Sequence, residues 1–137
     1  MIAILLGLLA ALTTVAGAQE PELPRAAERA RGAWYTHDAS GLVSGSPRLV
    51  IQLPGTDPSG ALGQAQAAAL LRDYFASAQE VETTIRSARE VEPGRGYVEL
   101  QRRYRVAGTQ DVRTQTLLLG YRLTQRGWVL VELRAGG

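Results

Sequence analysis

Residues 81–133 read VETTIRSAREVEPGRGYVELQRRYRVAGTQDVRTQTLLLGYRLTQRGWVLVEL, and this stretch decides the fold. Its apolar residues largely alternate with polar ones, a pattern typical of half-buried β-strands. Clusters of turn residues interrupt the alternation, and short turns of this kind join antiparallel strands. The stretch therefore predicts four antiparallel strands, at residues 81–91, 95–106, 111–124 and 127–133, with no further structure from Gly136-Gly137.

The alternation also predicts which side chains face the interior, because successive residues of a strand point to opposite faces. The expected inward residues are Val98, Leu100, Arg102, Tyr104, Val106, Leu117, Leu119, Tyr121, Leu123, Val129, Val131 and Leu133. Trp128 and Leu130 are expected on the outer face, and a β-bulge would shift any of these assignments by one residue.

Upstream segments look built to cover one face of this sheet. A helix is predicted from Pro24 to Trp34, because Leu23, Ala27, Ala30 and Trp34 recur at helical spacing. Asp38 is a suitable N-cap for a short helical turn that reaches residue 42. Residues 48–53 alternate as a short strand, and residues 64–78 form the longest uninterrupted helical pattern.

The first 18 residues contain no charged side chain and end in Ala16-Gly17-Ala18. This pattern predicts a signal peptide, residues 1–18, cleaved after Ala18, and hence a secreted or periplasmic protein. An uncleaved membrane anchor is the alternative. Residues 19–24 would then be a polar leader, and residues 25–137 a single domain.

Composition narrows the function classes further. The 137-residue chain contains no cysteine, so no disulfide can form, and its single histidine, His37, offers no metal-ligand cluster. All 15 basic residues other than histidine are arginines, yet the net charge is only +2. Nucleic-acid binding would require a larger positive excess. No metal, cofactor or nucleic-acid partner is therefore expected.

The order of elements resembles the nuclear transport factor 2-like superfamily, which includes the cystatin-like and ketosteroid isomerase-like domains. The resemblance rests on residues 38–42, 50–55, 68–75 and 127–133. It is closer still to small secreted bacterial domains of unknown function within that superfamily. It implies an α+β fold: a strongly curved antiparallel sheet of four long strands and one short N-terminal strand, wrapped cone-like around two to three helices, with a pocket at the open end.

Enzymes of that superfamily place an acid or a base in the pocket, usually Asp, His or Tyr. No aspartate of this sequence falls within an apolar alternation: Asp38 is a cap, Asp57 a turn residue, Asp73 a helix-surface residue and Asp111 the start of a strand. His37 is read as a loop residue, although a general base stays open as an alternative. No catalytic residue is predicted, and the expected role is a non-catalytic domain that binds a small ligand or a protein. The alternative is an isomerase, dehydratase or polyketide-cyclase-type enzyme.

Arg102 is the charged exception on the inward run of residues 95–106. A buried arginine needs a carboxylate partner or an opening to water. One hypothesis is a pocket for an anionic or carbonyl-bearing ligand, formed by Arg102, Tyr74, Tyr104, Tyr121 and Trp34. The alternative is an arginine that extends outward at the rim of the sheet.

The outer face of the sheet offers a second possible interaction surface. Trp128 and Leu130, if they point outward, would suit a homodimer formed through the sheet. The sequence names neither a ligand nor a protein partner.

Overall fold

The computed structural model describes residues 22–136, so the predicted signal peptide (residues 1–18) and residues 19–21 lie outside the described residues. The elements match the predicted order closely. The helices are α1 (Leu23–Tyr35), α2 (Ala39–Val43) and α3 (Gln64–Phe75). The strands are β1 (Val50–Gln52), β2 (Ala78–Glu92), β3 (Arg95–Val106), β4 (Val112–Thr124) and β5 (Gly127–Gly136).

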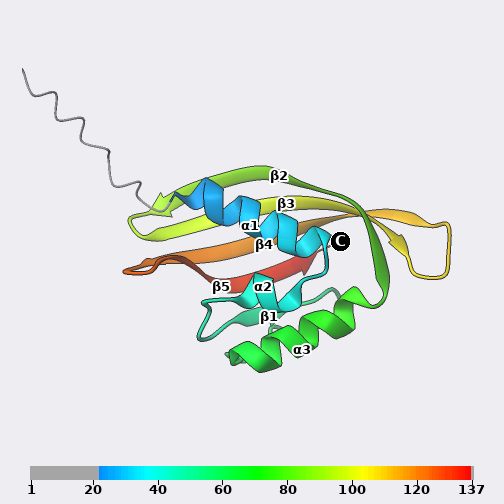
Figure 1. Cartoon of the computed structure of the whole chain (residues 1–137), viewed down its shortest axis with the longest axis horizontal. Coiled ribbons are helices and arrows are strands. Elements are labelled where there is room, and N and C mark those ends of the chain that lie inside the picture. Colours follow the sequence, from blue (N-terminus) through cyan, green and yellow to red (C-terminus); the bar gives the residue numbers. More distant parts are fainter. Residues whose placement is uncertain (1–21, 137) are drawn as a thin grey trace, which may run out of the picture.

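The five strands form one sheet in the order β1-β5-β4-β3-β2 (Figure 1). The four long strands pair with one another in antiparallel fashion, as predicted. β1 pairs in parallel with β5, which makes the sheet mixed rather than purely antiparallel. The last strand is longer than predicted, because β5 continues through Arg134 and the buried Ala135. The prediction that Gly136 adds no structure is wrong, since it pairs with Thr116 of β4, and Gly137 lies outside the described residues.

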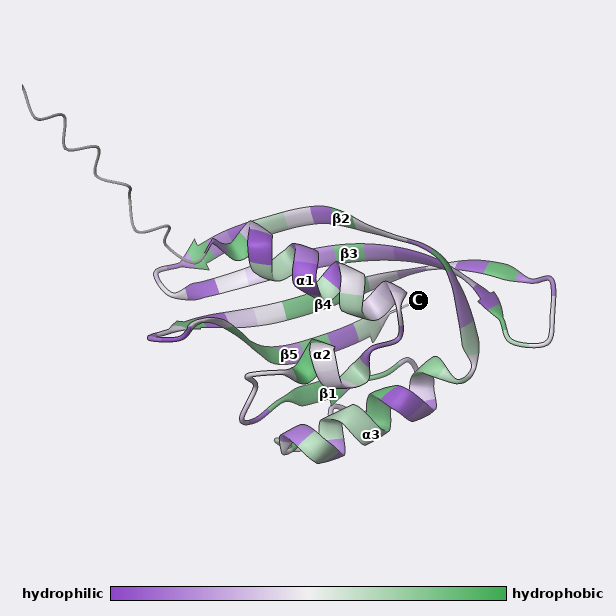
Figure 2. Cartoon of the chain, viewed as in Figure 1, coloured by the Kyte–Doolittle hydropathy of each residue, from purple (hydrophilic) through white to green (hydrophobic). Residues whose placement is uncertain are grey.

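One apolar core joins the helices to the inward side chains of the sheet. α1 packs on β2 and β3, while α2 contacts both α1 and α3. Trp34 of α1 and Leu71 of α3 are fully buried, as are Leu100 and Leu119 of the sheet. Coloured by hydropathy, the strands change between apolar and polar residues along their length (Figure 2). The core therefore lies on the face that the helices cover, and Leu100 and Leu119 face it as predicted.

β2 is bent by bulges. Its pairing with β3 slips between Glu80 and Glu82, between Ile85 and Ser87, and between Glu90 and Glu92. Each slip leaves one residue of β2 without a partner, and such bulges bend a strand and increase its twist. The strand rises from the end of α3 and curls over the helices (Figure 1). These bulges give the sheet its curvature and also change which side chains of β2 face inward.

A further bulge reverses the predicted faces of residues 128–130 in β5, whereas Leu133 faces the core as predicted. Tyr121 pairs with Leu130 while Gly120 pairs with Glu132, so Val131 is the extra residue. Leu130 is consequently buried in the core, and Trp128 packs against it. The prediction that Trp128 and Leu130 form an outer surface is wrong, and the homodimer surface built on them does not exist in this arrangement.

Candidate functional site

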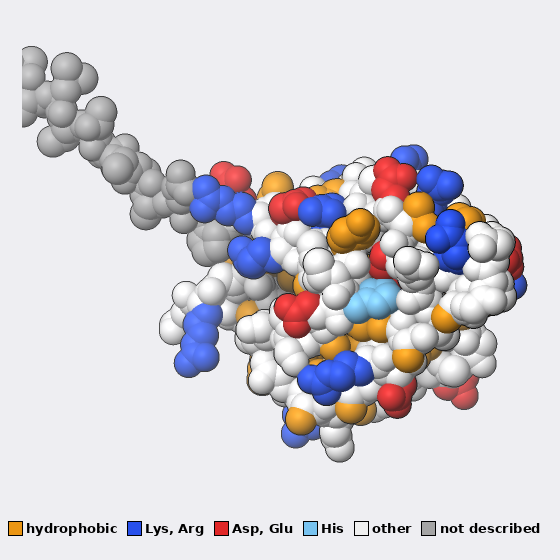
Figure 3. All heavy atoms as spheres, turned by 45° about the vertical axis from the view of Figure 1, so that its right-hand side comes forward, with side chains coloured by type: hydrophobic (Ala, Val, Ile, Leu, Met, Phe, Trp, Pro, Cys, Tyr) orange, Lys and Arg blue, Asp and Glu red, His pale blue; other side chains and the backbone are white. Residues whose placement is uncertain are grey.

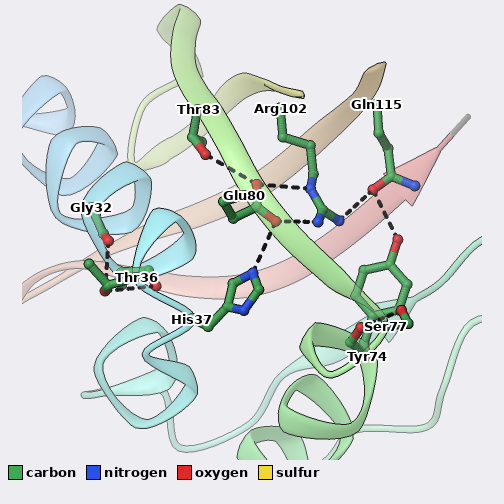
Figure 4. Close-up of polar contacts among 10 residues, drawn as sticks. Gly32, Thr36, His37, Tyr74, Ser77, Glu80, Thr83, Arg102 and Gln115 are labelled. Atoms are coloured by element: carbon green, nitrogen blue, oxygen red, sulfur yellow. Dashed lines mark hydrogen bonds and ion pairs between the residues drawn. The ribbon is translucent and has the colours of Figure 1, made fainter. Parts of the chain in front are cut away.

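A buried polar network spans three strands on the inner face of the sheet (Figure 4). Arg102 of β3 donates from Nε to Glu80 Oε2 over 3.2 Å, and from Nη2 to Glu80 Oε1. Its Nη1 donates to Gln115 Oε1 of β4 over 3.1 Å. The Arg102 and Glu80 side chains are only 1% and 2% exposed. This two-bond ion pair is the type of geometry that compensates burial of both charges.

The first bulge of β2 explains why Glu80 points inward. Glu80 pairs with Tyr104 and Glu82 pairs with Arg103, so Val81 is the extra residue between them. Without it, Glu80 and Glu82 would share one face, because side chains two apart in a strand point the same way. Instead Glu80 faces the interior beside Arg102, while Glu82 faces solvent.

Aromatic rings surround the guanidinium. The Cζ atom of Arg102 lies 4.0 Å from the ring centroid of Tyr104, 5.1 Å from that of Trp34 and 5.8 Å from that of Tyr74. These distances allow cation–π attraction, which is strongest when the cation is removed from water. The structure thus brings together four of the five predicted pocket residues. Tyr121 is not among them, since it lines a separate small cavity beside α1 and α2, together with Leu42 and Trp128.

Two tyrosines of the predicted set have pKa values shifted by burial. Tyr74 donates its hydroxyl to Gln115 Oε1 over 2.9 Å, so Gln115 accepts from both Tyr74 and Arg102. Burial raises the pKa of Tyr74, although the bond to Gln115 partly opposes this. Burial also raises the pKa of Tyr121. Both phenols are therefore neutral rather than charged at ordinary pH.

His37 connects the network to the surface. It lies in the predicted loop between α1 and α2, and its φ of 55° is the one positive value among the non-glycine residues of the described chain. Its Nε2 lies 3.0 Å from Glu80 Oε1, and its ring stacks on Phe75 at a centroid distance of 4.5 Å. The imidazole is visible on the molecular surface (Figure 3). Asp38, its neighbour in sequence, instead caps α2 by accepting from the Gly41 N–H over 2.9 Å.

The existing hydrogen bonds of this network leave few of its polar atoms free to contact a ligand. Glu80 accepts from Arg102 and contacts His37, and Thr83 Oγ1 lies 3.5 Å from its Oε2. A ligand carboxylate would have to displace Glu80 to reach Arg102. Among the described residues, Trp34 Nε1 is a buried donor that finds no acceptor.

Sequence reasoning missed Glu80 and Gln115. Gln115 could have been found, because it continues the inward run of Leu117 and Leu119. Glu80 could not, because the bulge that turns it inward leaves no mark in the alternation. Within residues 22–136, no group of three or more His, Asp or Glu side chains is placed to hold a metal ion. None of the helices in that range is long and apolar enough to cross a membrane.

Neither a family model nor a curated protein matches the sequence. Solved structures do match the fold. A ketosteroid isomerase-like protein from Erwinia carotovora atroseptica aligns with a TM-score of 0.68 and 15% identity, over 83% of this chain and 92% of that chain. A domain of unknown function with a cystatin-like fold from Nostoc punctiforme aligns with a TM-score of 0.64 and 15% identity, over 82% of this chain and 72% of that chain.

A third match is a hypothetical protein with a ketosteroid isomerase-like fold from Catenulispora acidiphila, in complex with trimethylamine. Its TM-score is 0.66 at 12% identity, over 83% of this chain and 85% of that chain. Identities this low establish shape and not activity. The chain has the nuclear transport factor 2-like fold that ketosteroid isomerase-like and cystatin-like domains share, as the sequence resemblance indicated.

Proposed function

We propose that this protein is an exported, non-catalytic domain that binds a small ligand. The observation that carries the proposal is the pairing of Glu80 with Arg102. The enzymes that this fold resembles need a free acid or base in the interior of the cone. Here the buried carboxylate already accepts hydrogen bonds from a guanidinium that lies 1% exposed. Both oxygens of this carboxylate are therefore engaged by Arg102, and neither is open to a substrate.

His37 is the residue on which an enzymatic alternative would depend. Glu80 orients its ring through Nε2, and the side chain is 25% exposed. A carboxylate that orients a histidine is the arrangement found in many general bases. The two grooves of substrate size beside the β4–β5 hairpin do not include His37 among their described lining residues. Binding is therefore better supported than turnover.

Small-ligand binding is compatible with the fold and with the surface of this chain. A neighbour of the same fold holds trimethylamine. The two grooves beside the β4–β5 hairpin measure about 570 and 590 Å³, within the size range of ligand sites. The predicted alternative site at Arg102 would require the ligand to replace Glu80, at the cost of a buried unpaired carboxylate.

Export is proposed from residues 1–18. The first helix begins at Leu23, so cleavage after Ala18 would leave every described helix and strand whole. N-terminal sequencing of the exported protein should start at Gln19. Recovery of the protein in the membrane fraction with Met1 retained would contradict cleavage.

Native mass spectrometry of the exported protein tests the binding role. A non-covalently bound small molecule is expected. The NMR spectrum of that molecule should stay unchanged during long incubation with the protein. Conversion of that molecule into a product, abolished in His37→Gln, would contradict the non-catalytic role.

A thermal-shift screen of carboxylates tests the predicted site at Arg102 separately. Equal responses from the native protein, Arg102→Leu and Arg102→Lys would rule out a ligand role for Arg102. The lysine variant keeps a positive charge beside Glu80. It therefore controls for a response that is lost only because Arg102→Leu is unfolded.

A further inference from the structure

A groove lies between the start of α1 and the β4–β5 hairpin, which share one end of the sheet (Figure 1). It encloses about 570 Å³, a volume that suits one small molecule. One wall of the groove depends on Leu23, which packs over Gly96. A Cβ atom added at Gly96 would lie 2.6 Å from Leu23 Cδ2. The absent side chain of Gly96 lets α1 settle on the β2–β3 hairpin, and this contact fixes one wall of the groove.

The opposite wall is apolar and accessible. Leu123 is 43% exposed, although alternation predicted an inward position, and Trp128 is half-buried beside it. Pro24 and Ala88 complete the apolar lining. An exposed leucine beside an indole ring offers favourable contact to a hydrocarbon chain.

Two carboxylates stand at the groove, Glu22 and Glu90. Within residues 22–136, no ion pair joins either of them to a basic side chain. Glu90 Oε1 accepts from the Gly94 N–H over 2.8 Å, which fixes the carboxylate and leaves Oε2 available. The positive end of the α1 dipole offsets part of one negative charge. None of the described residues that line the groove is basic, so the lining carries a net negative charge.

A second groove, on the other side of the same hairpin, has the opposite character. It has a similar volume of about 590 Å³, but it is lined by Arg126 and contains no carboxylate among its described residues. The two grooves share Thr124 and Gln125. Because the two grooves differ in charge, they should prefer ligands of opposite charge. The second groove therefore serves as a control for binding in the first.

We propose that the groove between α1 and the β4–β5 hairpin binds an amphipathic organic cation, with its alkyl chain on Leu123 and Trp128 and its ammonium group beside Glu22 and Glu90. Trp128 adds cation–π attraction to the carboxylate charges. This inference rests on the proposed binding function and names the site and the ligand class for it.

Calorimetric titration of the purified full chain tests the assignment with dodecyltrimethylammonium, dodecyl sulfate and dodecyl maltoside, each below its micelle-forming concentration. The cation should bind more tightly than the neutral or the anionic probe. Glu22→Gln with Glu90→Gln should weaken cation binding roughly three- to tenfold while leaving the neutral probe unchanged. The glutamine introduced in place of Glu90 keeps an amide oxygen that can still accept from the Gly94 N–H, so the hairpin stays capped.

Arg126→Gln in the second groove is the matched control and should leave cation binding unchanged. Equal affinity for the cation and the anion, or no effect of the two glutamine substitutions, would overturn the proposal. Binding of a different co-purified molecule that is insensitive to those substitutions would also overturn it, while the proposed binding function would stand. Absence of any bound molecule in either experiment would contradict both.

Discussion

Arg102 and Arg103 are neighbours in β3, and each pairs with a glutamate of β2, yet the two pairs lie in opposite environments. The Arg102–Glu80 side chains are 1% and 2% exposed, whereas the Arg103–Glu82 side chains are 51% and 54% exposed. The arginines differ by one position in sequence, and the bulge at Val81 separates the two glutamates between the faces of the sheet. A single extra residue therefore decides which charge the core must accommodate.

The comparison shows how little an ion pair's composition says about its role. In water, the attraction between Arg103 Nη1 and Glu82 Oε2 over 3.5 Å is screened and offset by lost side-chain entropy. Inside the cone, the same two residue types have lost their hydration and depend on each other. The interior pair consequently occupies the position at which the sequence predicted a ligand pocket around Arg102.

The largest expected difference is between Arg102→Leu and Arg103→Leu. Removing Arg102 leaves Glu80 buried without its main partner and should lower the free energy of unfolding by about 3–5 kcal/mol. Removing Arg103 should change it by at most about 1 kcal/mol. Denaturant unfolding measures both, and equal losses would break the comparison.

Replacing both members of the buried pair should restore much of that loss. Arg102→Met with Glu80→Leu removes both charges together and keeps apolar bulk, so no buried charge is left alone. The double variant should therefore be more stable than Arg102→Leu or Glu80→Leu alone. A double variant as unstable as the sum of the single losses would show that the two residues do not act as a pair.

Added salt should change the coupling free energies of the two ion pairs differently, and this difference should be smaller than that between the single substitutions. Screening weakens exposed pairs far more than buried ones, so the Arg103–Glu82 coupling should fall from a few tenths of a kcal/mol towards zero at about 1 M salt. The Arg102–Glu80 coupling should stay constant. Double-mutant cycles at low and high salt measure both, and a buried coupling that falls in parallel would indicate solvent access to the interior.

The smallest expected effect is the loss of stability at alkaline pH that is linked to the Tyr74 phenol. The pKa of Tyr74 is raised by burial above its usual value of 10.0, so the unfolded chain loses this proton first. The associated stability is present below pH 10 and declines as pH rises through the folded-state pKa. Denaturation measured across this range should show a shallower decline in Tyr74→Phe. Identical slopes in both proteins would place the phenol in solvent.

The strands that alternation predicted best are those whose pairing is unbroken. β3 pairs with β4 without a slip, and the inward assignment of Arg102 is confirmed there. Glu80, Trp128 and Leu130 lie beyond bulges, and a bulge arises from the pairing of distant strands rather than from local composition. The contact between His37 and Glu80 joins residues 43 positions apart, which no local pattern specifies.

Hydrogen exchange of the Arg102 and Arg103 guanidinium groups, followed by NMR, tests most directly whether the Arg102–Glu80 pair keeps water and ligands out of the protein interior. The Nε–H of Arg102 should exchange much more slowly than that of Arg103, and added carboxylates should leave its resonance unmoved. Exchange as fast as that of Arg103, with a resonance that shifts on addition of carboxylates, would contradict a filled interior and favour an open ligand pocket at Arg102.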